Sequence, residues 1–141
     1  MEQKTKEPFH VILLGVIFDP EKRKVLIARR SEEDKDIKNL TWQFPEGRLR
    51  HGDDVDKVLK TKVKDKTGLT VKNLGAVFYK TYPEKEDLLG VYFLCEAVEG
   101  LGNEKASDDF AELKWVSPHE IENYFQTSFD SRLKEYLLNL A

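Results

Sequence analysis

Apolar residues fall in short runs along most of the chain, and this pattern predicts strands. The runs are rich in β-branched and aromatic residues, and they are bounded by aspartate, proline, glycine and charged residues, which favour turns. The predicted strands cover residues 10–18, 25–28, 41–44, 69–82, 88–97 and 110–116. The predicted connections include charged loops at 29–38, 83–87 and 100–109, and a turn at 45–47.

One segment, residues 53–67, repeats its apolar positions with the period of a helix. Four apolar residues at helical spacing form one stripe: Val55, Val58, Leu59 and Val63. Three acidic residues stand in the first turn, where the helix dipole favours negative charge: Asp53, Asp54 and Asp56. Asp53 is expected to be the N-cap, and Gly68 stands where a C-terminal glycine cap belongs. The segment is therefore predicted to be an amphipathic helix.

Two shorter helices are predicted after the last strand. The sequence Ser117-Pro118-His119-Glu120 is a capping box with proline at the first helical position, and it begins a helix that ends near Phe125. Ser128 is expected to cap the last helix. The apolar face of that helix is Phe129, Leu133, Tyr136, Leu137 and Leu140. This order of elements predicts an α/β (α+β) fold, a mixed sheet sandwiched by helices, in a single domain over residues 1–141.

The composition favours a folded domain and weighs against two classes of partner. Hydrophobic residues make up 40% of the 141 positions and charged residues 35%, which argues against a disordered chain. There are 23 basic and 26 acidic side chains, giving a net charge of −3. Because this is near balance, no global field attracts nucleic acid or a membrane surface. An anionic ligand would have to be met by a local basic patch.

A lone cysteine and a charged N-terminal segment predict a cytoplasmic protein. Cys95 lies in the apolar run 91–95 with no histidine nearby in sequence, so it is expected to be a buried strand residue. One cysteine cannot form an internal disulfide, which fits a reducing compartment. Residues 1–7 lack the apolar core of a signal peptide, and no run reaches the length of a membrane span.

A spaced motif spans the loop and helix after the third predicted strand. Gly47 is followed after five residues by Asp53, and after seven more by the segment 61–69, which ends in Gly68-Leu69. This spacing resembles the Nudix box, G-x5-E-x7-R-E-U-x-E-E-x-G-U, where U is a bulky apolar residue. Three flanking segments, 26–30, 42–47 and 111–118, also resemble that family. The chain therefore resembles the Nudix hydrolase family (MutT-like) over roughly residues 9–125, and the resemblance implies an α/β/α sandwich.

The box keeps its spacing but departs from the family at the positions that serve chemistry. The resemblance implies that a face of three glutamates holds Mg²⁺ or Mn²⁺ against a diphosphate, where the metal offsets phosphate charge and helps to activate water. At those positions stand Lys62, Asp65 and Lys66, and the family's base position is Lys62. An ammonium group cannot ligate a cation, and the face carries +1 instead of −3. Metal-dependent hydrolysis is predicted to be abolished or strongly reduced, with Mg²⁺ or Mn²⁺ needed only if some activity remains.

Several basic residues are candidates for binding phosphate. Lys62 and Lys66 are expected to take over the electrostatic role of the metal, or else to be solvated cations of a helix face. The resemblance places four arginines beside the pocket: Arg29, Arg30, Arg48 and Arg50. Each is either a phosphate contact or a surface cation. Five strand aromatics are candidates for stacking a base or for the core: Trp42, Phe44, Phe78, Tyr79 and Tyr82. His51 is a candidate proton-transfer group or an exposed loop residue.

Acidic residues near the box could form a displaced metal site. Asp65 remains at a family ligand position, and the loop and strand after residue 100 carry Asp108, Asp109 and Glu112. We consider Asp65, Asp109 and Glu112 as weak candidate metal ligands. The alternative is an ordinary acidic surface loop.

Three functional hypotheses follow. The first is a domain that binds a nucleotide or another phosphorylated small molecule with little hydrolysis. The second is an active hydrolase of a nucleoside diphosphate-linked substrate that uses the displaced acidic ligands. The third is a protein-interaction module or a homodimer without catalysis.

Overall fold

The computed structural model describes residues 9–32, 41–125 and 129–141. The strands are β1 (His10–Asp19), β2 (Lys24–Arg30), β3 (Trp42–Gln43), β4 (Glu46–Leu49), β5 (Thr70–Tyr82), β6 (Lys85–Glu99) and β7 (Phe110–Val116). The helices are α1 (Val55–Thr67), the 3-10 turn η1 (Pro118–Glu120), α2 (Ile121–Tyr124) and α3 (Ser131–Leu138). Within the described residues, no helix combines the length and the apolar character needed to span a membrane.

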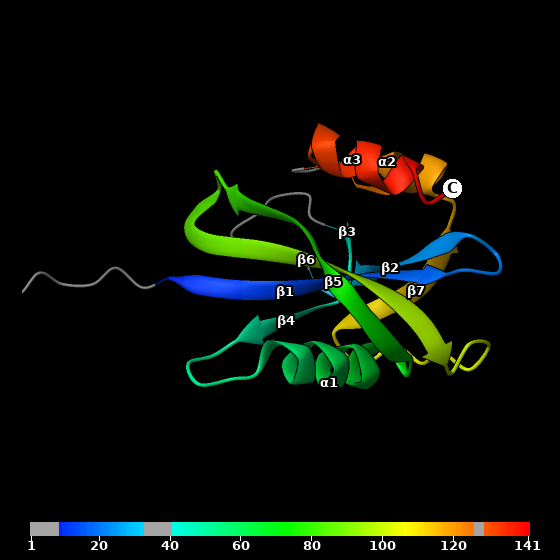
Figure 1. The fold of residues 1–141 in the computed structure, drawn as a ribbon, viewed down its shortest axis with the longest axis horizontal. Helices are drawn as coiled ribbons and strands as arrows, with labels where there is room; N and C mark the ends of the chain where they lie inside the picture. The colour runs from blue at the N-terminus through cyan, green and yellow to red at the C-terminus, as the bar shows by residue number, and fades with distance from the viewer. Residues whose placement is uncertain (1–8, 33–40, 126–128) are drawn as a thin grey trace, which may run out of the picture.

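The strands form one mixed sheet, which confirms the predicted fold class. Its order is β3-β2-β1-β6-β5, with β4 paired to β1 and β7 paired to β2. The pairing of β1 with β6 is parallel and the other pairings are antiparallel. Helix α1 covers one face of the sheet, and α2 and α3 lie together over the other face (Figure 1).

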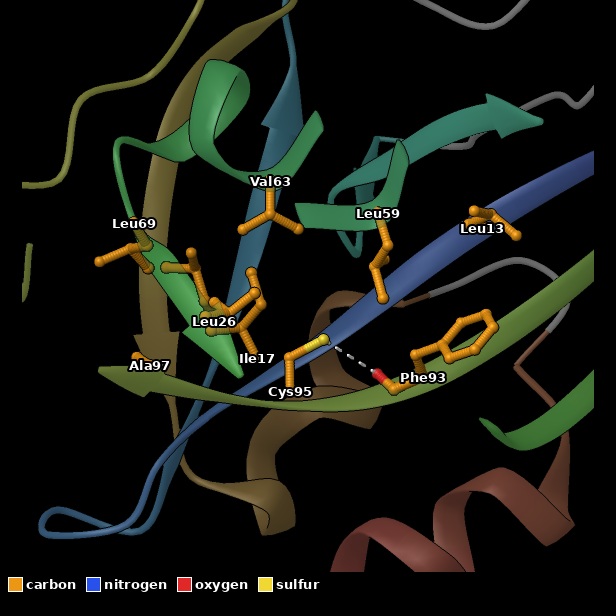
Figure 2. Packing of buried hydrophobic residues seen from close by; sticks show 10 residues of the cluster. Leu13, Ile17, Leu26, Leu59, Val63, Leu69, Phe93, Cys95 and Ala97 are labelled. Carbon is orange, nitrogen blue, oxygen red and sulfur yellow. Dashed lines mark hydrogen bonds between the residues drawn. The ribbon is translucent and has the colours of Figure 1, made fainter. Parts of the chain in front are cut away.

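Each face of the sheet has its own apolar core. On the α1 side, Leu59 and Val63 point from the helix toward Cys95 and the sheet (Figure 2). Cys95 is fully buried, as predicted, and burial raises the pKa of its thiol to about 12, so the thiolate nucleophile is not formed at neutral pH. The other core lies under α2 and α3 and contains Phe44 and Leu137.

The predicted amphipathic helix is present, with its N-cap one residue later than expected. The Asp54 carboxylate accepts a hydrogen bond from the Lys57 amide at 3.0 Å, which makes Asp54 the cap. Asp53 instead accepts from the Arg50 amide at 2.8 Å and holds the preceding turn. Gly68 ends the helix in the left-handed conformation, with φ of 79°, as predicted.

Other element boundaries also differ from the sequence-based expectation. The predicted turn at 45–47 overlaps the start of strand β4, because Glu46–Leu49 pairs with β1. Pro45, which has no backbone N–H to donate, lies just before this strand. Arg29 and Arg30 end β2 instead of beginning a loop, since β7 continues to pair with them. The capping box at Ser117 is confirmed. The last helix is capped by Asp130, and Ser128 lies outside the described residues.

Candidate functional site

The altered face of α1 lies against strand β4. The stem of Lys62 packs over Gly47 so closely that a Cβ added to Gly47 would lie 2.3 Å from Lys62 Cγ and 2.8 Å from its Cβ. Lys66 stands one turn later along the same face and is half-buried, whereas Asp65 is exposed. The three positions of the box therefore do not share one environment.

The close contact at Gly47 predicts that Gly47→Ala destabilises the protein by about 1–3 kcal/mol, because the Cβ and Cγ atoms of Lys62 must move away from the added methyl group. Urea unfolding of the two proteins measures this change. Lys62→Ala removes the nearer atom, so the double variant is expected to lose less stability than the sum of the two single changes. Strict additivity of the two changes would show that the contact is not the cause.

The Lys66 ammonium group is surrounded by oxygen atoms of its own chain. It donates a hydrogen bond to the Glu46 carbonyl oxygen at 2.7 Å. Its Nζ is also 4.0 Å from Glu46 Oε1 and 3.8 Å from Asp109 Oδ2. The Lys66 side chain is 17% exposed, so these attractions act in a medium less polar than bulk water. The ammonium group thus links α1, β4 and the loop before β7.

A cleft of about 290 Å³ opens beside this ammonium group. It is lined by Arg30, Ser31, Glu32, Gln43, Glu46, Lys66, Asp108, Asp109 and Phe110. Two cationic side chains in this lining face four carboxylates, which gives the lining a formal charge of −2. The reversed charge predicted for the helix face is therefore local, and the cleft beside it is acidic.

Backbone hydrogen bonds fix the loop that carries the two aspartates. The Ser107 and Lys105 amides donate to the carbonyl oxygens of Lys66 and Thr67, at 3.2 and 2.9 Å. On the opposite side, the Ser31 amide donates to the Asp109 carbonyl oxygen at 3.0 Å and the Ser31 hydroxyl donates to the Asp108 carbonyl oxygen at 2.8 Å. The loop is thus tied both to the end of α1 and to the end of β2.

Among the four candidate arginines, only Arg30 lines the cleft. Its Nη1 donates to the Gln43 side-chain oxygen at 2.7 Å. Arg29 points elsewhere and forms an ion pair with Glu112 at 3.4 Å. Alternation along the end of β2 explains the difference, because consecutive strand residues face opposite sides of the sheet.

The other two arginines lie outside the cleft lining. Arg48 contacts the ring of His10, and His10 Nε2 is 3.5 Å from Asp87 Oδ2. Arg50 is exposed in the turn before α1, next to exposed His51. A role for them in ligand binding stays a prediction.

The three candidate metal ligands are not brought together. Asp109 faces Lys66, Glu112 pairs with Arg29, and Asp65 is exposed. In the described ranges, no group of three or more histidine, cysteine, aspartate or glutamate side chains is arranged to hold a metal ion.

Sequence reasoning missed Ser31, Gln43 and Glu46 as parts of the cleft. Of these three, Gln43 carries a signal in the sequence, because it is a polar residue between Trp42 and Phe44. In the structure Gln43 is 8% exposed. The candidate stacking aromatics mostly serve the core: Phe44 and Tyr82 are buried, while Tyr79 is 72% exposed.

Comparison with known proteins finds a matching family model and similar solved structures. Residues 8–139 match the family model described as NUDIX domain. No curated protein matches the sequence. A MutT protein from Methanosarcina mazei Go1 has a similar structure, with a TM-score of 0.73 at 18% identity over 97% of this chain and 96% of that one.

Two further similar structures are of proteins described as ADP-ribose pyrophosphatases. An ADP-ribose pyrophosphatase from Streptococcus suis 89-1591 has a TM-score of 0.60 at 19% identity, over 78% of this chain and 75% of that one. A bifunctional NMN adenylyltransferase/ADP ribose pyrophosphatase from Francisella tularensis has a TM-score of 0.69 at 15% identity, and the match covers 97% of this chain but 42% of that one. Identities this low establish a common fold and nothing about substrate.

Proposed function

This chain belongs to the NUDIX domain family, and from that premise we propose that it binds a nucleotide or another phosphorylated small molecule in the cleft beside α1, without efficient metal-dependent diphosphate hydrolysis. The observation that carries the proposal is the position of the Lys66 ammonium group. It stands at the border of the cleft, half-buried, at a position where the family motif has a glutamate.

The side chains beside the cleft do not fit a divalent cation. Such an ion takes oxygen ligands and is repelled by a neighbouring ammonium group. Lys66 Nζ already uses the Glu46 carbonyl oxygen as an acceptor, and the remaining box carboxylate, Asp65, is exposed. At about 4 Å, each pair of unit charges contributes roughly 4 kcal/mol at an effective dielectric of 20, so the positive charge of Lys66 weighs heavily against metal binding.

A phosphate group is a better match for the same ammonium group. Lys66 has three donor hydrogens, and only one is used by the Glu46 carbonyl oxygen. The Asp109 carboxylate, 3.8 Å from Nζ, belongs to a side chain that is 67% exposed, so a phosphate oxygen can replace it beside Nζ. Arg30 lies in the same lining and adds a second cation.

The acidic lining favours ligands with few negative charges. A nucleoside triphosphate carries about twice the charge of a diphosphate diester, and it would meet the carboxylates of the cleft without a metal to screen them. We therefore expect ADP-ribose, a diphosphate diester, to bind better than ATP when no divalent ion is present.

A thermal-shift titration tests the proposal. ADP-ribose and ATP are added in EDTA or in excess Mg²⁺, and a ligand at 100 times its Kd stabilises the folded state by about 2.7 kcal/mol. We expect stabilisation by ADP-ribose in EDTA, with no further gain from Mg²⁺. Stabilisation that requires Mg²⁺, or Mg²⁺-dependent cleavage as fast as that of an ADP-ribose pyrophosphatase assayed in parallel, would contradict the proposal.

A matched pair of variants locates the binding site. Lys66→Met is expected to weaken ADP-ribose binding by about 10-fold or more, because a charge-assisted hydrogen bond is lost. Lys64→Met removes the same charge from the exposed side of the same helix, where Lys64 Nζ contacts the Thr70 hydroxyl at 3.3 Å, and should leave binding unchanged. Equal losses in the two variants would place the ligand elsewhere.

The displaced metal site has no support in the arrangement of Asp65, Asp109 and Glu112. A homodimer, a single-domain organisation over residues 1–141 and a cytoplasmic location stay predictions.

A further inference from the structure

We propose that Gln43 is a positioning residue that holds the Arg30 guanidinium group in the cleft beside α1, where that group contacts the anionic part of the ligand. The inference rests on the proposed function, since it concerns the same cleft. It adds a residue that acts on the ligand through another side chain. It also states what the amide of Gln43 supplies, which is a hydrogen-bond acceptor without a charge.

The pairing of β2 with β3 brings the two side chains to the same face of the sheet. Gln43 pairs directly with Ala28, and the Arg30 amide donates to the Thr41 carbonyl oxygen at 2.8 Å. Arg30 is thus the diagonal neighbour of Gln43, and residues two apart on a strand share a face. Because the side chain of Ala28 ends at its Cβ, it leaves the longer Gln43 side chain room to reach Arg30.

Both ends of the Gln43 amide are used, and this fixes the direction in which the amide points. Gln43 is 8% exposed, and a polar group with so little access to water needs hydrogen-bond partners. Its side-chain oxygen accepts from Arg30 Nη1 at 2.7 Å, and its side-chain nitrogen donates to the Phe44 carbonyl oxygen at 3.3 Å. A guanidinium group only donates and a carbonyl group only accepts, so the reversed amide would lose both bonds.

A second neutral oxygen also holds the guanidinium group. Arg30 Nε donates to the Glu32 carbonyl oxygen at 3.1 Å, so Glu32 and Gln43 each accept from a different nitrogen. Two bonds from different nitrogens define the orientation of a planar group. Arg30 and Gln43 both belong to the cleft lining, so the guanidinium group is presented to the cleft in a fixed direction.

The neutrality of this acceptor matters as much as its position. A glutamate side chain has nearly the same length and shape as glutamine, but at position 43 it would place a negative charge at contact distance from the guanidinium group. That charge would attract the same cation and repel a phosphate group. The carboxylates of the lining already outnumber its cations. The amide of Gln43 therefore orients Arg30 without adding to the repulsion of an anion.

Three variants of the full chain separate orientation from charge. Gln43→Met keeps the length of the side chain and removes the acceptor. Gln43→Glu keeps an acceptor and adds a negative charge. Thr61→Glu is the matched control, because it adds one negative charge at an exposed position of α1 outside the cleft lining. Calorimetry in EDTA measures ADP-ribose binding, and urea unfolding measures the stability of each variant.

We expect Gln43→Glu to bind ADP-ribose about 10-fold or more weakly than the unmodified chain, without a loss of stability, because the new carboxylate pairs with Arg30. A residue with only a structural role would lose stability and affinity together. Unchanged affinity in a folded Gln43→Glu chain, or an equal loss in Thr61→Glu, would overturn the inference.

Gln43→Met provides a second test that does not depend on the new charge. It should also weaken binding, and adding Arg30→Met to it should cause little further loss, because the two side chains act together. Losses that simply add in the double variant would contradict the inference. If Gln43→Glu does not fold, this comparison decides.

Nuclear magnetic resonance follows the Arg30 guanidinium group directly. The Arg30 Nε–H signal of the unmodified chain should shift when ADP-ribose is added. In ligand-free Gln43→Met the same proton should exchange with water several-fold faster, because the guanidinium group has lost a fixed partner. Arg29, which pairs with Glu112, is the internal control, since a general loss of stability would affect both arginines. Equal exchange of the Arg30 proton in the two proteins would contradict a positioning role.

This inference and the proposed function fail in different ways. If the unmodified chain and Gln43→Glu bind ADP-ribose equally well in EDTA, the inference is wrong and the proposed function stands. If the unmodified chain does not bind ADP-ribose, the proposed function is wrong. Exchange of the Arg30 proton in the ligand-free protein then still decides whether Gln43 holds the guanidinium group.

Discussion

Replacing both box lysines, as Lys62→Glu with Lys66→Glu, is expected to give this protein divalent-dependent hydrolysis of ADP-ribose at least about 100-fold above the unmodified chain. The double change turns the charge of the altered α1 face from +1 to −3, because Asp65 is kept. A bound metal contributes several kcal/mol of charge stabilisation in the transition state, and about 1.4 kcal/mol corresponds to a factor of ten in rate. Release of AMP and ribose 5-phosphate, followed by chromatography with Mg²⁺ or with EDTA, measures the gain.

The control keeps the total charge change and moves it to the other side of the helix. Lys57→Glu with Lys64→Glu alters two exposed lysines of α1 that are not among the cleft-lining residues. We expect no hydrolysis from that variant. If the Lys62/Lys66 double variant is folded and binds Mn²⁺ but stays inactive, the rest of the cleft lacks groups that the reaction needs, and the prediction is wrong.

Phe44→Ala is expected to have the largest effect on stability, a loss of about 3–5 kcal/mol in the free energy of unfolding. The Phe44 side chain is 1% exposed and packs edge-on against Phe125 and Tyr92, with ring centroids 4.9 and 6.0 Å away. Its removal leaves a cavity where β3, α2 and β6 meet. Urea unfolding measures the loss, and the Tm should fall by roughly 10 °C or more.

An exposed aromatic residue provides the comparison for this core change. Tyr79→Ala removes a side chain that is 72% exposed, and its effect should stay within about 0.5 kcal/mol. Phe44→Leu keeps most of the buried volume and should fall between the two. A Phe44→Ala protein that loses less than about 1 kcal/mol would mean that the core collapses around the missing ring, or that the ring contributes little.

The sequence pattern predicted the elements that depend on local or periodic signals. Helix α1 was predictable because its apolar stripe and the glycine at position 68 both act within the segment itself. Strand β4 was not, because Pro45 and Gly47 indicate a turn and the pairing of Glu46–Leu49 with β1 is a long-range contact. The caps at Asp54 and Asp130 were missed by a residue or two, since neighbouring polar residues compete for the same role.

The candidate site was predictable in its position and incomplete in its composition. The box spacing pointed to Lys62 and Lys66, and the structure places Lys66 beside the cleft. The arginine that lines the cleft is Arg30 and not Arg29, a choice that depends on which face of β2 each side chain takes. The acidic character of the cleft arises from four carboxylates that lie outside α1, so the charge of α1 alone could not reveal it: Glu32, Glu46, Asp108 and Asp109.

The parallel pairing of β1 with β6 has a consequence for how the chain acquires its structure. Strand β1 lies at the centre of the sheet, yet His10 pairs with Leu88, far along the chain. During synthesis β1 therefore leaves the ribosome long before its main partner exists, with its apolar side chains uncovered. Distant pairings of this kind slow folding to milliseconds or longer. Nascent chains that stop before β6 should thus be targets for chaperones, and aggregation should depend on β1.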